Sequence, residues 1–126
     1  MKKILAPISI GELIDKITIL EIKEKNMTGE KLENVKKELD YLLVIAKQSN
    51  INLNNPNVDK LRSINKELWN IEDEIRKKEL QKSFEESFIN LARSVYIKND
   101  TRSFLKKTIN IEHGSDLIEE KSYESD

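Results

Sequence analysis

The sequence predicts an all-α fold, an antiparallel four-helix bundle with a C-terminal helical extension and an acidic tail. Apolar residues recur at intervals of three and four along most of the chain, which is the period of helices that bury one face. Only three glycines and two prolines interrupt the 126 residues, and no segment alternates apolar and polar residues as a strand does. Helices joined by short loops pack antiparallel to their neighbours. A chain of this length forms one domain, here residues 1–126.

The first helix is expected over residues 9–25. Ser9 and Glu12 form a Ser-x-x-Glu capping box, which satisfies free N–H groups where a helix begins. Most apolar residues of this segment share one stripe: Ile10, Leu13, Ile14, Ile17 and Leu20. Because Ile19 and Ile22 fall on other sides, the helix is either central in the bundle or buried against a second subunit. We expect the second arrangement, a homodimer.

The second and third helices are expected over residues 30–48 and 58–81. The stretch between them is rich in asparagine and contains Pro56, which predicts the longest internal loop. The third helix repeats apolar residues in a 3-4-3-4 order typical of a bundle seam. These residues are Leu61, Ile64, Leu68, Ile71 and Ile75.

The fourth helix is expected over residues 84–109, with a broad apolar face. The sequence does not decide whether this helix continues through Asn99 or ends there and restarts with Asp100 as the cap of a last segment. From residue 112 onward the chain has six acidic residues and one lysine, Lys121. This composition predicts a loosely ordered tail over residues 112–126.

Composition excludes several classes of protein and site. The chain has no cysteine and one histidine, His113, which excludes disulfides, thiolate metal sites and a two-histidine metal site. The 22 basic and 23 acidic residues give no reason to expect nucleic acid or an anionic membrane as a partner. No apolar run is long enough for a signal peptide or a membrane span, so a cytoplasmic location is expected.

Carboxylates of the first and third helices are candidate metal ligands. Helix geometry places Glu21, Glu24 and Glu72 on or beside the apolar stripes. Carboxylate oxygens suit Mg²⁺ and Mn²⁺, so Mg²⁺ is the cofactor that such a cluster would imply. Arg76 and Arg102 are candidate partners for an anionic ligand. The structural alternative is ordinary ion pairing, such as Glu72 with Arg76 four residues on.

Several stretches resemble a known family. They are residues 11–23 (GELIDKITILEIK), 68–76 (LWNIEDEIR), 88–96 (FINLARSVY), 99–102 (NDTR) and 119–123 (EEKSY). They are similar to a group of short bacterial proteins catalogued only as a domain of unknown function. Members are often encoded near glycosyltransferase and surface-polysaccharide genes, so the resemblance implies an accessory role in that metabolism. The position of a gene near other genes gives no information about the chemical mechanism of its product.

The resemblance adds four candidate ligand-binding residues, Arg93, Tyr96, Asn99 and Asp100. If the helix is regular there, Arg93, Tyr96 and Asp100 fall within about 60° on one side of it. A ligand bound by such residues would be a small anion or a protein partner.

These residues are compatible with two functions. The first is a non-enzymatic helical binding protein, homodimeric, that takes a protein partner or a small anionic ligand. The alternative is a Mg²⁺-dependent nucleotide pyrophosphohydrolase of the MazG type, which uses a Glu-x-x-Glu pair followed by a Glu-x-x-Asp pair. Glu21 and Glu24 supply the first pair, but the Glu-x-x-Asp pair of Glu12 and Asp15 precedes it on the same helix. Whether the chain is an enzyme therefore stays open at this point.

Overall fold

A computed structural model describes residues 2–123 and contains four helices with no strand in that part of the chain. The helices are α1 (Ile10–Asn26), α2 (Gly29–Gln48), α3 (Pro56–Leu80) and α4 (Glu86–Glu112). The all-α prediction is confirmed, and each helix end lies within three residues of its expected place. Helix α4 continues through Asn99 without a break. No helix among the described residues is long and apolar enough to cross a membrane.

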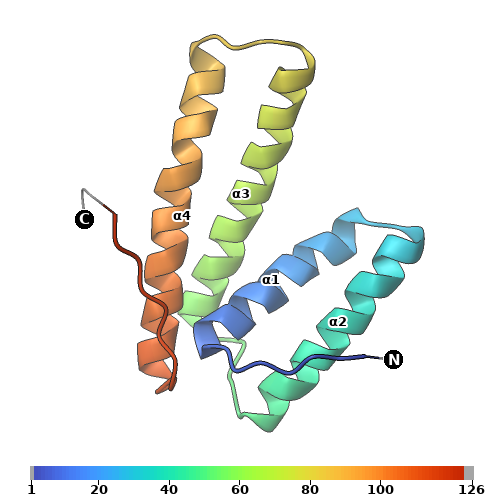
Figure 1. Cartoon of the computed structure of the whole chain (residues 1–126), viewed down its shortest axis with the longest axis vertical. Helices are drawn as coiled ribbons and strands as arrows, with labels where there is room; N and C mark the ends of the chain where they lie inside the picture. The colour runs from blue at the N-terminus through green and yellow to red at the C-terminus, as the bar shows by residue number, and fades with distance from the viewer. Residues whose placement is uncertain (1, 124–126) are drawn as a thin grey trace.

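The four helices form two hairpins that meet at one end (Figure 1). Helices α3 and α4 make the longer hairpin, and α1 and α2 make the shorter one. Helix α1 packs against the other three helices, whereas α2 packs against α1 alone. The hairpins diverge from their common end, so the four helices do not surround one shared core. The expected antiparallel four-helix bundle is not confirmed.

The two-sided apolar character of α1 explains this arrangement. One face packs against α2 in a buried cluster of Leu13, Ile17, Leu20, Val35, Leu39 and Ala46. The neighbouring face packs against α3 and α4 in a second cluster of Ile14, Val58, Leu61, Ile64, Leu105 and Ile109. Helix α1 is thus central, and these two faces are covered within the chain. The apolar faces of α1 therefore give no support to the predicted homodimer.

The first N–H groups of α1 are satisfied by Asn110 of α4, by Ser115, which follows α4, and by the N-cap residue Ser9. A helix leaves its first four N–H groups without internal partners. Here each has an acceptor: Ser115 Oγ for Ile10, Asn110 Oδ1 for Gly11, Ser9 Oγ for Glu12 and Ser9 O for Leu13. A Cβ atom at Gly11 would lie 2.5 Å from the Lys106 carbonyl oxygen. Glycine is therefore required where the two helices touch.

The tail returns along α4 and makes defined contacts (Figure 1). Ser9 Oγ donates to Glu119 Oε1 at 2.6 Å, Lys106 Nζ lies 3.4 Å from Glu119 Oε2, and Lys107 Nζ lies 3.0 Å from Glu120 Oε2. Two acidic residues of the tail, Glu119 and Glu120, thus pair with lysines of α4. The sequence predicted a loosely ordered tail and did not predict these contacts. The last three residues of the predicted tail lie outside the described residues.

These contacts predict an acid-sensitive attachment of the tail. The pKa of Glu119 is lowered from 4.5, first by the hydrogen bond from Ser9 and also by the charge of Lys106, which together outweigh burial. A carboxylate whose folded pKa is lowered adds stability above its unfolded pKa and loses it as pH falls through the folded pKa. We expect Glu119→Gln to unfold at lower urea concentration than the wild type at about pH 7, and this difference to vanish well below about pH 4.5.

The matched control is Glu120→Gln, because Glu120 lies next to Glu119 but its one ion pair within residues 2–123 is with the exposed Lys107. Its urea midpoint is expected to stay close to that of the wild type at every pH. A difference between Glu119→Gln and the wild type that persists unchanged in acid would contradict the assignment.

Candidate ligand-binding site

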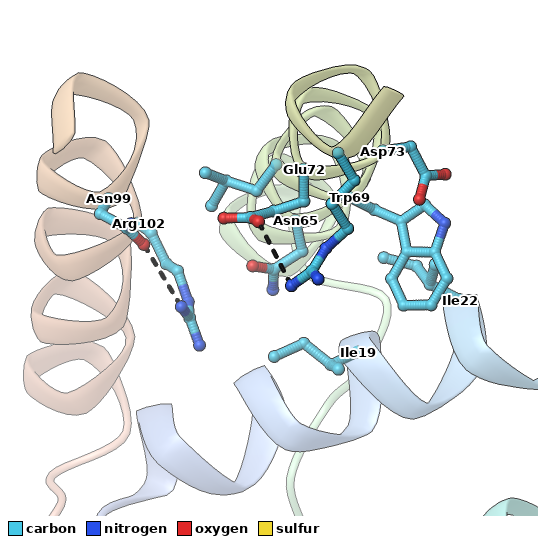
Figure 2. Close-up of a pocket in the computed structure, with 10 residues that line it drawn as sticks. Ile19, Ile22, Asn65, Trp69, Glu72, Asp73, Asn99 and Arg102 are labelled. Carbon is cyan, nitrogen blue, oxygen red and sulfur yellow. Dashed lines mark hydrogen bonds and ion pairs between the residues drawn. The ribbon is translucent and has the colours of Figure 1, made fainter. Parts of the chain in front are cut away.

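A cavity of about 480 Å³ opens between α1 and the α3–α4 hairpin, where the hairpins diverge (Figure 2). Cavities of this size accommodate small molecules. Ten residues from three helices line it: Ile19, Ile22, Asn65, Leu68, Trp69, Glu72, Asp73, Arg76, Asn99 and Arg102.

A buried polar network lies beneath one end of the cavity. Asp15 of α1 is only 1% exposed. Its Oδ1 accepts hydrogen bonds from Arg102 Nε and from Asn65 Nδ2, both at 2.9 Å, and its Oδ2 accepts one from Arg102 Nη2. Asn65 Nδ2 also donates to Thr18 Oγ1 at 2.8 Å. A buried carboxylate is costly unless it is paired and hydrogen-bonded, and this network supplies both conditions.

Arg102 is held in one orientation by this network. The Asp15 carboxylate accepts two of its N–H groups side by side, the geometry that orients a guanidinium most firmly. Its Nη1 donates to Asn99 Oδ1 at 3.3 Å, as Figure 2 shows. The pKa of Arg102 is raised above its ordinary value, mainly by the hydrogen bond to Asp15, so the side chain stays charged.

Arg102 keeps hydrogen-bonding capacity for a ligand. A guanidinium has five N–H groups, and three of them are engaged by Asp15 and Asn99. The remaining N–H groups have no partner among residues 2–123, and the side chain lines the cavity. The end of the cavity next to α4 therefore offers an oriented cation with free donors.

The α3 wall of the cavity carries an aromatic ring and a second arginine. Trp69 lies beside Ile22 of α1 (Figure 2), and the two also line a smaller hollow of about 220 Å³ between α1 and α3. Arg76 Nη2 lies 3.9 Å from Glu72 Oε2, at an exposed position. The two lining arginines are balanced by two lining carboxylates, those of Glu72 and Asp73. The cavity thus combines a flat apolar surface with charges of both signs.

The three predicted metal ligands do not meet. Glu21 forms an ion pair with Arg62, whose Nε lies 3.1 Å from Glu21 Oε1, in the smaller hollow between α1 and α3. Glu72 instead lines the main cavity beside Arg76, and Glu24 lines neither space. No group of three His, Cys, Asp or Glu side chains within the described residues is placed to hold a metal ion.

The predicted ligand-binding residues divide into two groups. Arg76, Asn99 and Arg102 line the cavity. By contrast, the other three, Arg93, Tyr96 and Asp100, are exposed and line none of the described cavities. The reason is that α4 continues through Asn99. Successive side chains of a helix are 100° apart, so Arg93, Tyr96 and Asp100 lie on a different side of α4 from Asn99 and Arg102.

Asp15, Thr18 and Asn65 belong to the site but were not predicted as site residues. Asp15 and Thr18 are polar positions buried among apolar residues of α1. The signal for Asp15 is its position on the side of α1 that also carries Ile19 and Ile22, because a polar group buried beside apolar residues needs partners elsewhere.

A larger hollow of about 550 Å³ lies between the N-terminal segment and the α1–α2 hairpin. Its lining is mostly apolar, and its charged residues are Lys16 and Glu38. Both side chains are exposed, and neither is held in place by a buried residue of opposite charge. The cavity beside Arg102 is the better candidate site because its polar groups are few and held in place.

The comparisons with known proteins give one match. Residues 4–126 match a protein family described only as a family of unknown function. No curated protein and no solved structure matches the chain.

Proposed function

The chain belongs to the family of unknown function DUF6165, and we propose from its own geometry that it is a non-enzymatic helical binding protein. The proposed site is the cavity beside Arg102. Its ligand is a small molecule that joins an anionic group to a flat ring. The observation that carries this proposal is the buried Asp15, which orients Arg102 and leaves part of its guanidinium open to the cavity.

An oriented guanidinium favours a carboxylate or phosphate ligand. The fork formed by Nε and Nη2 is taken by Asp15, and the remaining N–H groups of Arg102 are charge-assisted donors that favour an anionic oxygen. Because Asp15 already holds Arg102 in place, little side-chain entropy is lost when the ligand binds. Trp69, at the other side of the cavity, supplies a face on which a planar ring stacks. The two features together define a ligand with two different ends.

Binding rather than turnover is proposed because three of the four charged side chains that line the cavity occur in ion pairs. Arg102 is paired with Asp15, and Glu72 lies near Arg76. A role beside surface-polysaccharide synthesis, which the family resemblance implies, makes nucleotide sugars suitable probes. These molecules carry a diphosphate and a planar base. A protein partner is the competing proposal and predicts no response to such probes.

Calorimetric titration with UDP and UDP-glucose tests the proposal. We expect saturable binding of at least one of them, and Trp69→Ala to weaken it by about tenfold, since stacking of a base on an aromatic ring contributes about 1–3 kcal/mol. The matched control is Tyr41→Ala, which removes an exposed aromatic ring of α2 and should leave the affinity unchanged.

Two results would count against the site. If neither probe binds and neither raises the unfolding temperature at high concentration, the cavity does not take this class of ligand. If a probe binds equally well to Trp69→Ala and to the wild type, its site lies elsewhere on the chain.

A further inference from the structure

The outer face of α4 is used by neither the core nor the cavity. Five large apolar side chains there are between 48% and 71% exposed: Ile89, Tyr96, Ile97, Phe104 and Ile111. Helix α4 buries Leu105 and Ile109 on its inner face, so it is apolar on both sides. Exposed large apolar side chains gathered on one face of a helix are typical of an interaction site.

Two charged residues lie among these apolar side chains. At 100° per residue, Arg93 and Asp100 fall in the middle of the sector of about 100° that the five apolar residues span. Both are exposed. These two groups, one basic and one acidic, lie two helical turns apart at the centre of the face, and neither has an ion-pair partner within residues 2–123.

We propose that this face binds the same face of a second copy of the chain, with the two α4 helices antiparallel. A two-fold axis between Tyr96 and Ile97 places Arg93 opposite the partner's Asp100, and Asp100 opposite the partner's Arg93. The same register places Ile89 opposite the partner's Phe104. Such an interface is isologous, because one surface is complementary to itself.

The register follows from the order of residues along α4. Moving the partner by four residues, about one helical turn, would set Arg93 opposite the partner's Phe104 and leave both charges without counter-charges. Charged positions within an apolar seam select a register in this way, at some cost in stability. Glu86 and Lys107 obey the same symmetry at the ends of the interface, although Lys107 also pairs with Glu120 of its own tail.

The charge order also argues for a second copy over an unrelated helix or a charged surface. Along this face the signs alternate: Glu86, Arg93, Asp100 and Lys107. A uniformly acidic or basic partner would complement half of these groups and repel the others. An antiparallel copy complements all four. The inference is independent of the cavity and of its ligand.

Charge reversal tests the interface in solution. The wild type is expected to sediment as a dimer, and Arg93→Glu or Asp100→Arg alone to raise its dissociation constant by about tenfold or more, through like charges placed face to face. An equimolar mixture of the two variants should form heterodimers, because the carboxylate introduced in one chain then meets the guanidinium introduced in the other. The double variant, Arg93→Glu with Asp100→Arg, should form homodimers again.

Cysteine crosslinking supplies a second measurement, since the chain has no native cysteine. Ile97→Cys lies next to the proposed axis and should form a disulfide between copies on oxidation. Thr108→Cys lies about 16 Å further along the helix and should not. Both charge-reversed positions are exposed, so circular dichroism should show unchanged helix content. A wild type that stays monomeric, or a dimer indifferent to either charge reversal, would overturn the proposal.

Discussion

Replacing Arg102 by methionine is expected to lower the free energy of unfolding by about 3–5 kcal/mol, the usual cost of removing one partner of a buried ion pair. The reason is Asp15, which is 1% exposed and would keep only the hydrogen bond from Asn65. The carboxylate would then be buried with no hydrogen-bonded counter-charge, and only the charge of Lys106 would remain to act on it. Urea unfolding at neutral pH measures the loss.

Two variants separate this effect from the loss of a long side chain. Arg76→Met removes another arginine of the same cavity, but its ion pair with Glu72 is 3.9 Å long and exposed, so a change within about 0.5 kcal/mol is expected. The double variant Asp15→Asn with Arg102→Met removes both charges and should be more stable than Arg102→Met alone. Equal losses for Arg102→Met and Arg76→Met would refute the role given to Asp15.

The second large effect is expected from alanine at Ile14 and at Ile17, which are both fully buried. Each substitution should cost about 2–5 kcal/mol, through lost burial and the cavity that remains. Ile17 lies in the cluster shared with α2, whereas Ile14 lies in the cluster shared with α3 and α4. The two variants should therefore weaken different parts of the molecule.

Hydrogen exchange distinguishes the two variants. Since α2 packs against α1 alone, Ile17→Ala should raise exchange in α2 more than in the α3–α4 hairpin. Ile14→Ala should raise exchange near Leu61 and Ile109, which belong to the other cluster. The control is Ile111→Ala, which removes a side chain that is 64% exposed and should change stability by less than about 0.5 kcal/mol. The same exchange pattern in both variants would show that the clusters unfold together.

Three of the five stretches that carry the family resemblance, residues 11–23, 99–102 and 119–123, meet at the contact between α1 and α4. Gly11 permits the close approach of the two helices, and Asp15 pairs with Arg102. Glu119 of the tail accepts the hydrogen bond from Ser9, beside that contact. These residues hold α1 in the position that shapes the cavity. The proposed binding function therefore depends on the geometry that these three stretches hold.

The sequence by itself determined the helices and most of their ends. Helix formation depends on residues three and four apart and on capping groups such as Ser9, which act within one or two turns. The apolar residues on several sides of α1 also indicated a helix with more than one packing partner. These features are local, so they can be derived without knowing where distant segments lie.

Only the tertiary structure decided how the hairpins diverge and which polar groups meet. Asp15 and Arg102 are 87 residues apart in the chain, and their pairing depends on the rotation and register of α1 against α4. The same holds for Glu119 with Ser9, 110 residues apart, and for the separation of Glu21 from Glu72. Helical periodicity gives the face on which a residue lies but not the element that faces it, because that choice is made by packing of the whole chain.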